Sequence, residues 1–445
     1  MIISRSATLL IAATALLFLG CEKQEPAKEE RPATAVGSDW AVNVGGPAYT
    51  GSDGTEFRAD ESISGGDVGR INSVKGTQDK FLFQSYREGE IEVSREFANG
   101  IYDVTLYFAE PDNIDGGERL FDIIINDQVL LEDLDVMVQR GHIRSGLTVT
   151  APNVHIDDGQ LRVRFDASVK QAVLSALAVR GKNRPDKNWR LVWSDEFDVD
   201  GPPNPDNWHL QEWPPDVVNN EDQAYTARSK NIRVENGHLI VEAFNEDYDD
   251  ARYTSGRIHS QGKHEFLYGR FEARAKPPRG QGNWAAIWML PSDPFKYATN
   301  CKDIPNWQGN SDCDAWPNSG EIDILEHVGY QQGHIHGTVH NRAYYFINKE
   351  ERKGRAIFPD VSEEFHTYVI EWYPDRIDMY VNDTLYFTYM NENKGWREWP
   401  FDHPYHWIIN LAIGGNWGRA GGPIDDSMFP QRLVVDYVRV YQLDE

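Results

Sequence analysis

Short runs of alternating apolar and polar residues follow one another along most of the chain beyond its N-terminal segment. Clear examples are IYDVTLYF at 101–108, LRVRF at 161–165 and RIDMYV at 376–381. Successive side chains of a β-strand point to opposite faces, so this alternation predicts strands with one buried face. Turn signals such as Asn99-Gly100 separate the runs, and no long stretch has helical periodicity. The pattern predicts an all-β protein.

The strand pattern divides into two parts joined by a predicted linker at residues 182–188, KNRPDKN. Residues 38–181 have the spacing of strands and turns that is typical of an antiparallel β-sandwich. Residues 189–445 continue with short strands but hold 13 of the 14 tryptophans. We expect this second part to be a larger β-sandwich, a jelly roll, with a groove on one concave sheet face.

The N-terminus has the features of an export signal. Arg5 precedes an apolar run at 7–19 that is too short to span a membrane, so residues 1–20 are interpreted as a signal peptide. The sequence LFLGC ends at Cys21 and resembles a bacterial lipoprotein cleavage box, which would make Cys21 the lipidated residue. The alternative is an ordinary secreted protein. Residues 21–37 are polar and form a predicted flexible tether.

Composition narrows the classes of partner. The net charge of −26 argues against nucleic acid, which needs a basic face, and against adhesion to anionic lipid. A neutral substrate is compatible with it, and abundant tryptophan and tyrosine suit sugar binding; the alternative is that the acidity only aids solubility. We expect an exported lipoprotein of the outer membrane or cell surface, a monomer that touches the membrane only through its lipid anchor.

Two cysteines remain beyond the N-terminal segment, Cys301 and Cys313. Export permits a disulfide, and a bridge between these two would stiffen a single loop rather than join two domains. Two free thiols are the alternative. A metal site is not expected from two isolated cysteines.

The segment SGEIDILEHVG at 319–329 contains three carboxylates at unusual spacing. On a regular strand Glu321 and Asp323 share a face, whereas Glu326 would point to the apolar side. A β-bulge that absorbs Ile324 or Leu325 restores the register and places all three acids on one face, and bulges are frequent beside active sites. A solvated acidic surface is the alternative for this spacing taken alone.

Such a group of acids fits one reaction well. Retaining glycoside hydrolysis needs two carboxyl groups about 5 Å apart, one as nucleophile and one as acid/base. A third acid nearby raises the proton affinity of its neighbours, so that one of them keeps a proton near neutral pH. We therefore interpret the motif as catalytic, with Asp323 assisting the nucleophile.

At these residues the chain resembles glycoside hydrolase family 16, in particular its laminarinase-like members, over about residues 189–443. The motifs that carry the resemblance occur in order: WSDEF at 193–197, NNE at 219–221, YTSGRI at 253–258, YGRFEAR at 268–274, GNWAAIWML at 282–290, the acid motif, HGTVH at 336–340, GGNW at 414–417 and VDYVRV at 435–440. The resemblance implies a concanavalin A-like jelly roll with Glu321 as nucleophile, Asp323 as assisting acid and Glu326 as acid/base.

The resemblance also implies roles outside the acid motif. Trp284, Trp288 and Trp316 fall where the family lines its sugar subsites, with core packing as the alternative for each. His340 matches a histidine near the cleaved sugar, with a structural histidine as the alternative. Asn220 and Arg257 match polar contacts on the non-reducing side, and the alternative for Arg257 is a structural ion-pair partner. Glu196, the Gly237 carbonyl and Asp436 match ligands of a structural calcium, with solvated acids as the alternative. No cofactor is expected for catalysis.

The first part of the chain resembles malectin-like carbohydrate modules, a galactose-binding-like β-sandwich. The resemblance rests on NVGGPAY at 43–49, YDVTLYFAE at 102–110, RLFDIIIN at 119–126 and LSALAVR at 174–180. Malectin has sugar-binding aromatics after the residue that corresponds to Glu110, where this chain has Pro111-Asp112-Asn113. Tyr86 remains a candidate aromatic platform for a sugar. The fold is therefore expected, and a structural spacer is the alternative to a glycan-binding module.

These features are compatible with three functions. The first is a retaining endo-β-glycosidase acting on β-1,3-glucan of the laminarin type, with mixed-linkage β-glucan or a galactan such as agarose or porphyran as alternative substrates. The second is a non-catalytic glycan-binding surface lipoprotein, and the third is an adhesion scaffold with an unused groove. Loop departures from the family, including 295–314 and WAA at 284–286, leave the exact glucan open. The intact acids favour the first function.

Overall fold

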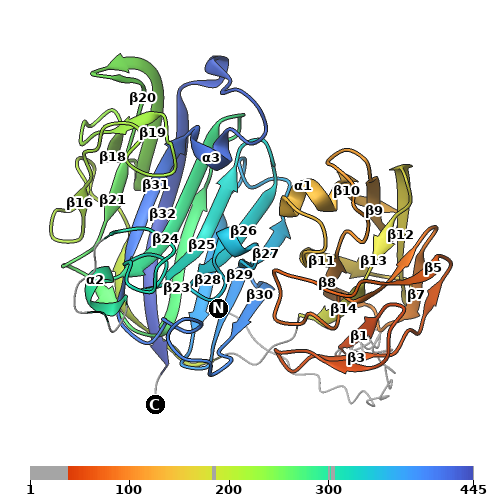
Figure 1. Ribbon diagram of the computed structural model, residues 1–445. Coiled ribbons are helices and arrows are strands. Elements are labelled where there is room, and N and C mark those ends of the chain that lie inside the picture. The colour runs from red at the N-terminus through yellow and green to blue at the C-terminus, as the bar shows by residue number, and fades with distance from the viewer. Residues whose placement is uncertain (1–38, 183–186, 299–300, 302–305, 444–445) are drawn as a thin grey trace, which may run out of the picture. The chain divides into compact units, whose positions relative to one another are not determined.

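The computed structural model describes residues 39–182, 187–298, 301 and 306–443, and strands dominate these residues (Figure 1). The all-β prediction is confirmed. The predicted signal peptide, the tether at 21–37 and Cys21 lie outside the described residues. Within the described part, no helix is long and apolar enough to cross a membrane.

The N-terminal domain is built from three groups of strands. One has the order β10-β9-β12-β7-β4, the second β13-β6-β5, and the third β11-β8-β14-β1-β3-β2. The elements are β1 (Trp40–Asn43), β2 (Tyr49–Thr50), β3 (Glu56–Arg58), β4 (Ile63–Ser64), β5 (Asp67–Arg70), β6 (Ser85–Glu88), β7 (Glu92–Glu96), β8 (Gly100–Phe108), β9 (Leu120–Ile125), β10 (Gln128–Leu134), α1 (Val136–Arg140), β11 (Leu147–Ile156), β12 (Gln160–Val169), β13 (Val173–Leu174) and β14 (Ala176–Gly181).

The core of this domain explains why the alternating runs fold as they do. Leu161, Val163 and Phe165 of β12 are buried, while the residues between them are exposed. The ring of Phe165 packs against Phe108 of β8 and Phe121 of β9, so side chains from both layers meet in one core. The predicted sandwich is confirmed.

The C-terminal domain has two layers of strands. The inner layer follows the order β16-β21-β31-β24-β25-β26-β27 with β22 beside β31, and the outer follows β17-β20-β19-β32-β23-β28-β29-β30 with β15 beside β32 and β18 beside β19. The elements are β15 (Trp189–Asp195), β16 (His209–Leu210), β17 (Gln223–Tyr225), β18 (Ile232–Glu235), β19 (His238–Tyr248), β20 (Ala251–Ser255), β21 (Arg257–His259), β22 (Glu265–Phe266), β23 (Gly269–Lys276), β24 (Asn283–Pro291), α2 (Pro294–Tyr297), β25 (Glu321–Val328), β26 (His334–His340), η1 (Phe346–Asn348), β27 (Arg352–Ile357), β28 (His366–Trp372), β29 (Arg376–Val381), β30 (Thr384–Met390), β31 (Tyr405–Ile413), α3 (Gly415–Gly418), η2 (Asp426–Met428) and β32 (Gln431–Leu443).

The two faces of β24 show how the inner layer separates core from groove. Ala285, Ile287 and Met289 are fully buried between the layers. The intervening Trp284 and Trp288 are only partly buried and lie on the opposite face. Period-two alternation thus gives one face to the hydrophobic core and leaves the other for large aromatic side chains. The predicted jelly roll with a tryptophan-lined face is confirmed.

The described residues belong to one compact unit, and β11 and β27 are parallel neighbours through the pair Thr150–Ala356. Ile357, the last residue of β27, is 3% exposed and packs with the core of the N-terminal domain. Hydrogen bonds also join the two domains; in one of them, Thr384 Oγ1 donates to Asp103 Oδ1 at 3.2 Å. The inner layer of the C-terminal domain is thereby continued by strands of the N-terminal domain.

Candidate active site

A β-bulge in β25 brings the three acids of the motif onto one face. Against β24, Asp323 pairs with Trp288 and Leu325 with Ile287, so Ile324 is the extra residue. The pairing with β26 shifts at the same place. An extra residue reverses the facing of everything beyond it. The predicted bulge is therefore present, and all three carboxylates line one groove.

Each carboxylate of the cluster has a defined neighbour. Trp316 Nε1 donates to Glu321 Oε2 at 2.9 Å, and Trp284 Nε1 donates to Glu326 Oε1 at 3.2 Å. His340 Nε2 lies 3.1 Å from Asp323 Oδ2 and 3.6 Å from Glu321 Oε1.

A second donor, Thr338 Oγ1, reaches Glu326 Oε2 at 3.2 Å from the neighbouring strand. Indole and hydroxyl donors fix the orientation of a carboxylate without neutralising its charge. The acids are therefore held in place and remain chemically available.

Electrostatics favour the protonated forms of all three acids. Asp323 is 2% exposed and Glu326 is 8% exposed. Burial, followed by the charge of Asp323, raises the pKa of Glu321 well above its usual range. Burial and the charge of Glu326 do the same for the pKa of Asp323, and burial raises the pKa of Glu326. The cluster holds protons at pH values where isolated carboxyl groups have lost them.

The cluster lies in a cavity of about 790 Å³ that crosses the inner layer. Its walls come from six adjacent strands, β21, β31, β24, β25, β26 and β27, which Figure 1 shows side by side. Six strands spaced about 4.8 Å apart span roughly 24 Å. A groove of this length accommodates several sugar residues of one chain, and rings line it on both sides of the acids.

The other residues assigned from the sequence lie in or beside this groove. Trp284, Trp288, Trp316, His340 and Arg257 all line it. Asn220 does not; its amide donates to Asn416 Oδ1 at 2.6 Å, and its neighbour Asn219 lines the groove instead.

Arg257 lies against two aromatic rings of the groove. It is buried, and its guanidinium stacks on the rings of Trp213 and Trp288, 4.7 and 4.9 Å from their centroids. Such stacking is typical of arginine and is worth about 1 kcal/mol or more per ring when desolvated. Arg257 therefore holds two groove rings in position.

Several groove residues were missed. Glu351 and Lys353 come from the β27 side, and His259, His406 and Asn410 come from the β21 and β31 side. Further rings are contributed by Trp213, Trp307, Phe346 and Trp417. Trp417 belongs to a motif quoted above and was within reach of sequence reasoning. No sequence pattern pointed to Lys353, because only the pairing of β25, β26 and β27 brings it to the acids.

Cys301 and Cys313 are bridged, with their Cα atoms 5.6 Å apart. The bridge closes a short loop, as expected from the sequence. Trp307 and Trp316 frame the same region, and the backbone of Trp316 donates to the carbonyl of Trp307 at 2.6 Å. The loop that carries the disulfide therefore also supports a ring that contacts Glu321.

Two of the three residues assigned to calcium, Glu196 and Asp436, are engaged by arginines. The Glu196 carboxylate accepts from Arg439 at 2.9 and 2.7 Å. The Asp436 carboxylate pairs with Arg274. In this arrangement calcium would have to displace both arginines, so the residues as placed do not fit a calcium site. The calcium stays a prediction.

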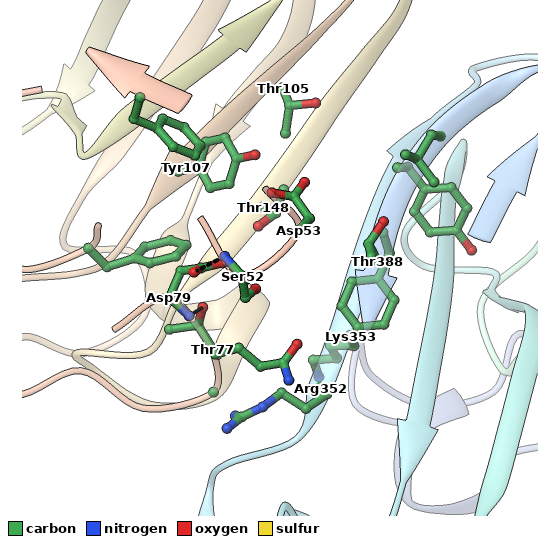
Figure 2. Close-up of a pocket in the computed structure, with 18 of the residues that line it drawn as sticks. Ser52, Asp53, Thr77, Asp79, Thr105, Tyr107, Thr148, Arg352, Lys353 and Thr388 are labelled. Carbon is green, nitrogen blue, oxygen red and sulfur yellow. Dashed lines mark hydrogen bonds between the residues drawn. The ribbon is translucent and has the colours of Figure 1, made fainter. Parts of the chain in front are cut away.

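A second, smaller cavity of about 90 Å³ lies between β27 and β30 of the C-terminal domain and the N-terminal domain. Figure 2 shows Ser52 hydrogen-bonded to Asp79 on one side, and Arg352, Lys353 and Thr388 on the other. Its acids already have partners: Asp79 accepts from Ser52, and Asp53 pairs with Arg180 at 2.6 Å. The cavity is polar but holds no uncompensated acid cluster.

The N-terminal domain has its own buried acid, Glu110, at the end of β8. Glu110 and Arg119 are each 1% exposed, and Arg119 Nε donates to Glu110 Oε2 at 2.8 Å. The same guanidinium reaches Glu88 at 2.8 Å and Asp112 at 3.1 Å. Asp112 stands in the PDN segment that replaces the aromatics of malectin. One arginine therefore organises this cluster.

Known proteins match both domains. A family model described as glycosyl hydrolases family 16 matches residues 219–438, and one described as malectin domain matches residues 38–185. A β-glucanase of Rhodothermus marinus is 44% identical over 279 residues, covering 61% of this chain and 92% of that protein. A glucan endo-1,3-β-glucosidase of Cryptopygus antarcticus is 34% identical over 268 residues, covering 56% and 91%.

A solved structure supports the same grouping. The X-ray structure of the laminarinase from Rhodothermus marinus has 44% sequence identity and a TM-score of 0.53, and the match covers 59% of this chain and all of that one.

Proposed function

The chain belongs to glycoside hydrolase family 16, with a malectin domain preceding the hydrolase domain, and on this premise we propose that it is a retaining endo-β-1,3-glucanase. The observation that carries the proposal is the bulged β25, which turns Glu321, Asp323 and Glu326 into one groove beside indole donors. The linkage preference is supported by relatives named as laminarinase and endo-1,3-β-glucosidase.

The first step is attack by the Glu321 carboxylate on the anomeric carbon of the bound sugar. The bond to the leaving oxygen breaks, and Glu326 gives its proton to that oxygen, so that one glucan fragment departs with a hydroxyl. Glu321 is then esterified to the remaining fragment. Asp323 shares a proton with Glu321 before attack, because burial and like charge disfavour two neighbouring anions.

In the second step water attacks the anomeric carbon of the glycosyl ester. Glu326, now ionised, takes the proton from this water, and the C–O bond to Glu321 breaks. The enzyme returns to its starting protonation state. His340, 3.1 Å from Asp323 and 3.6 Å from Glu321, keeps the two acids oriented through both steps.

Endo action is supported by the groove itself. Its walls extend over strands on both sides of the acids, with Trp213 and Arg257 toward one end and Phe346 and Glu351 toward the other. A chain bound across all six strands places an internal linkage, rather than an end, over β25. We also propose that the mature protein is an exported lipoprotein anchored through Cys21.

The test is reducing-end release by the full-length protein on laminarin, mixed-linkage β-glucan and agarose, beside Glu321→Gln and Glu326→Gln. We expect laminarin to be cleaved fastest, and each variant to lose about 10⁴-fold or more in kcat. Cleavage of agarose alone would keep the mechanism and change the substrate, whereas binding without any cleavage would favour a surface glycan binder.

A further inference from the structure

Lys353 occupies a defined position beside the acid/base. In the ladder between β26 and β27 it pairs with Thr338, and in the next ladder Thr338 pairs with Asp323. Directly paired residues of neighbouring strands point to the same face of a sheet. The side chain of Lys353 is therefore on the groove face, and it lines the groove together with Glu326 and Thr338.

The charges around Lys353 set it apart from other lysines. Among the described residues that line the groove, Lys353 and Arg257 are the ones with a lysine or arginine charge, and Arg257 is stacked between two rings on the far side of the acids. Within the same described part, no hydrogen bond or ion pair fixes the ammonium of Lys353. Its charge is consequently free to act on the carboxylates beside it.

All groups facing the pair contribute to its electrostatics. Besides Glu326, Lys353 faces Glu351 and Arg355 from its own segment and Arg140 from α1. Glu326 has Glu321 and Asp323 on its own strand and Trp284 on β24. On its other side are His336, Thr338 and His340 of β26, where His336 also faces Lys353, and Tyr386 of β30.

These groups leave both charges sensitive to pH. Burial, together with Arg140, lowers the pKa of Lys353 to about 8. The charges of His340 and Lys353 oppose the rise in the pKa of Glu326 caused by burial.

We propose that Lys353 is a positioning residue of this site, whose ammonium charge controls when Glu326 holds and releases its proton. The proposal rests on the proposed function, because it concerns the acid/base of that reaction. A cation beside Glu326 favours the ionised form, which is needed to accept the proton of water in the second step. Without it, Glu326 would stay protonated to higher pH and would be a weaker acid toward the leaving oxygen.

The experiment compares pH profiles of kcat/KM on laminarin for the full chain, Lys353→Met and Lys353→Arg. Loss of the charge raises the pKa of Glu326, so we expect the basic limb of Lys353→Met to move up by about one pH unit. Lys353→Arg keeps the positive charge, so its basic limb should lie at the same pH as that of the wild type. Lys276→Met, on β23 of the outer layer, removes the same net charge far from the groove and should match the wild type.

The outcomes separate this proposal from its premise. A wild type that cleaves no glucan would refute the proposed function before any variant is compared. An active wild type whose basic limb is unmoved in Lys353→Met would overturn the role of Lys353, as would a higher KM alone, which indicates sugar binding instead. If Lys353→Met does not fold by circular dichroism, Lys353→Gln replaces it with the same expected shift.

Discussion

This molecule contains two acid clusters whose hydrogen-bond partners differ in charge. In the N-terminal domain, Glu110 accepts two hydrogen bonds from one guanidinium, that of Arg119, at 2.8 and 3.2 Å. In the groove, Glu321 and Glu326 accept hydrogen bonds from indoles and a hydroxyl, and no arginine or lysine within the described residues makes an ion pair with them. Both clusters are largely shielded from water, and only one is compensated by a hydrogen-bonded guanidinium.

Under the proposed function, the difference separates a structural acid from a reactive one. Burial raises the pKa of Glu110, but the hydrogen bonds and charge of Arg119 oppose that rise. For Glu321, burial and the charge of Asp323 act in the same direction. Under the proposed function, Glu321 must be free to attack and Glu326 must exchange a proton. Neither acid is bonded to a guanidinium, and the cost in stability of burying them is retained. The predictions below test this contrast from its largest expected effect to its smallest.

The largest effect is expected from Arg119→Met. The change leaves Glu110 buried without its partner, and breaking a buried pair in this way costs about 3–5 kcal/mol. We expect a markedly lower unfolding transition in calorimetry, with glucan cleavage per folded molecule unchanged.

The matched control is the double variant Glu110→Gln/Arg119→Met, which removes both charges. It should recover much of the lost stability, because the uncompensated anion is gone. Arg119→Met as stable as the wild type would show that the two clusters do not differ as described.

A smaller effect of opposite sign is expected from Glu321→Gln. The folded protein holds the Glu321 proton more tightly than the unfolded chain, whose value is 4.5, so stability falls as pH rises from there through the folded pKa. Each unit of that shift corresponds to about 1.4 kcal/mol. Glu321→Gln does not bear the cost of ionising a buried carboxyl group. Its melting temperature should therefore exceed that of the wild type by a few degrees at pH 8.

The comparison is made at pH 4 and pH 8, with all other titrating groups common to both proteins. At pH 4 Glu321 is protonated in folded and unfolded chains, so the melting temperatures should nearly coincide. Equal melting temperatures at pH 8 would mean that the groove acid carries no stability penalty.

Features that depend on neighbours along the chain could be predicted from the sequence. Alternation predicted both sandwiches, and the spacing of the acid motif predicted a bulge at Ile324 or Leu325, where the register shift is found. The tryptophans of β24 were assigned to the groove through the family resemblance, and the structure shows their apolar alternates on the opposite face. For the strands and the bulge, period-two geometry converts a local pattern directly into a face of a sheet.

Features that depend on strands distant in sequence could not be predicted. Lys353 is 27 residues beyond Glu326 and reaches it only because β26 pairs with both β25 and β27. The arginines that engage Glu196 and Asp436 likewise come from β32 and β23. Asn219 and Asn220 are adjacent and alike, so only the backbone of their turn decides which one lines the groove.

The smallest effect is expected from Trp316→Phe, which keeps a ring in the groove but removes the donor to Glu321. A hydrogen bond to a charged group contributes about 1.5–3 kcal/mol, so kcat/KM should fall by about 10- to 100-fold. The lost bond had lowered the pKa of Glu321 against burial, so the acidic limb of the kcat/KM profile should move to higher pH.

Trp417→Phe is the matched control, because Trp417 lines the groove without bonding to an acid, and it should alter KM and leave that limb in place. If the acidic limb lies at the same pH in both variants, Trp316 contributes to sugar binding rather than to the ionisation of Glu321. The indole donor would then not be what keeps Glu321 reactive.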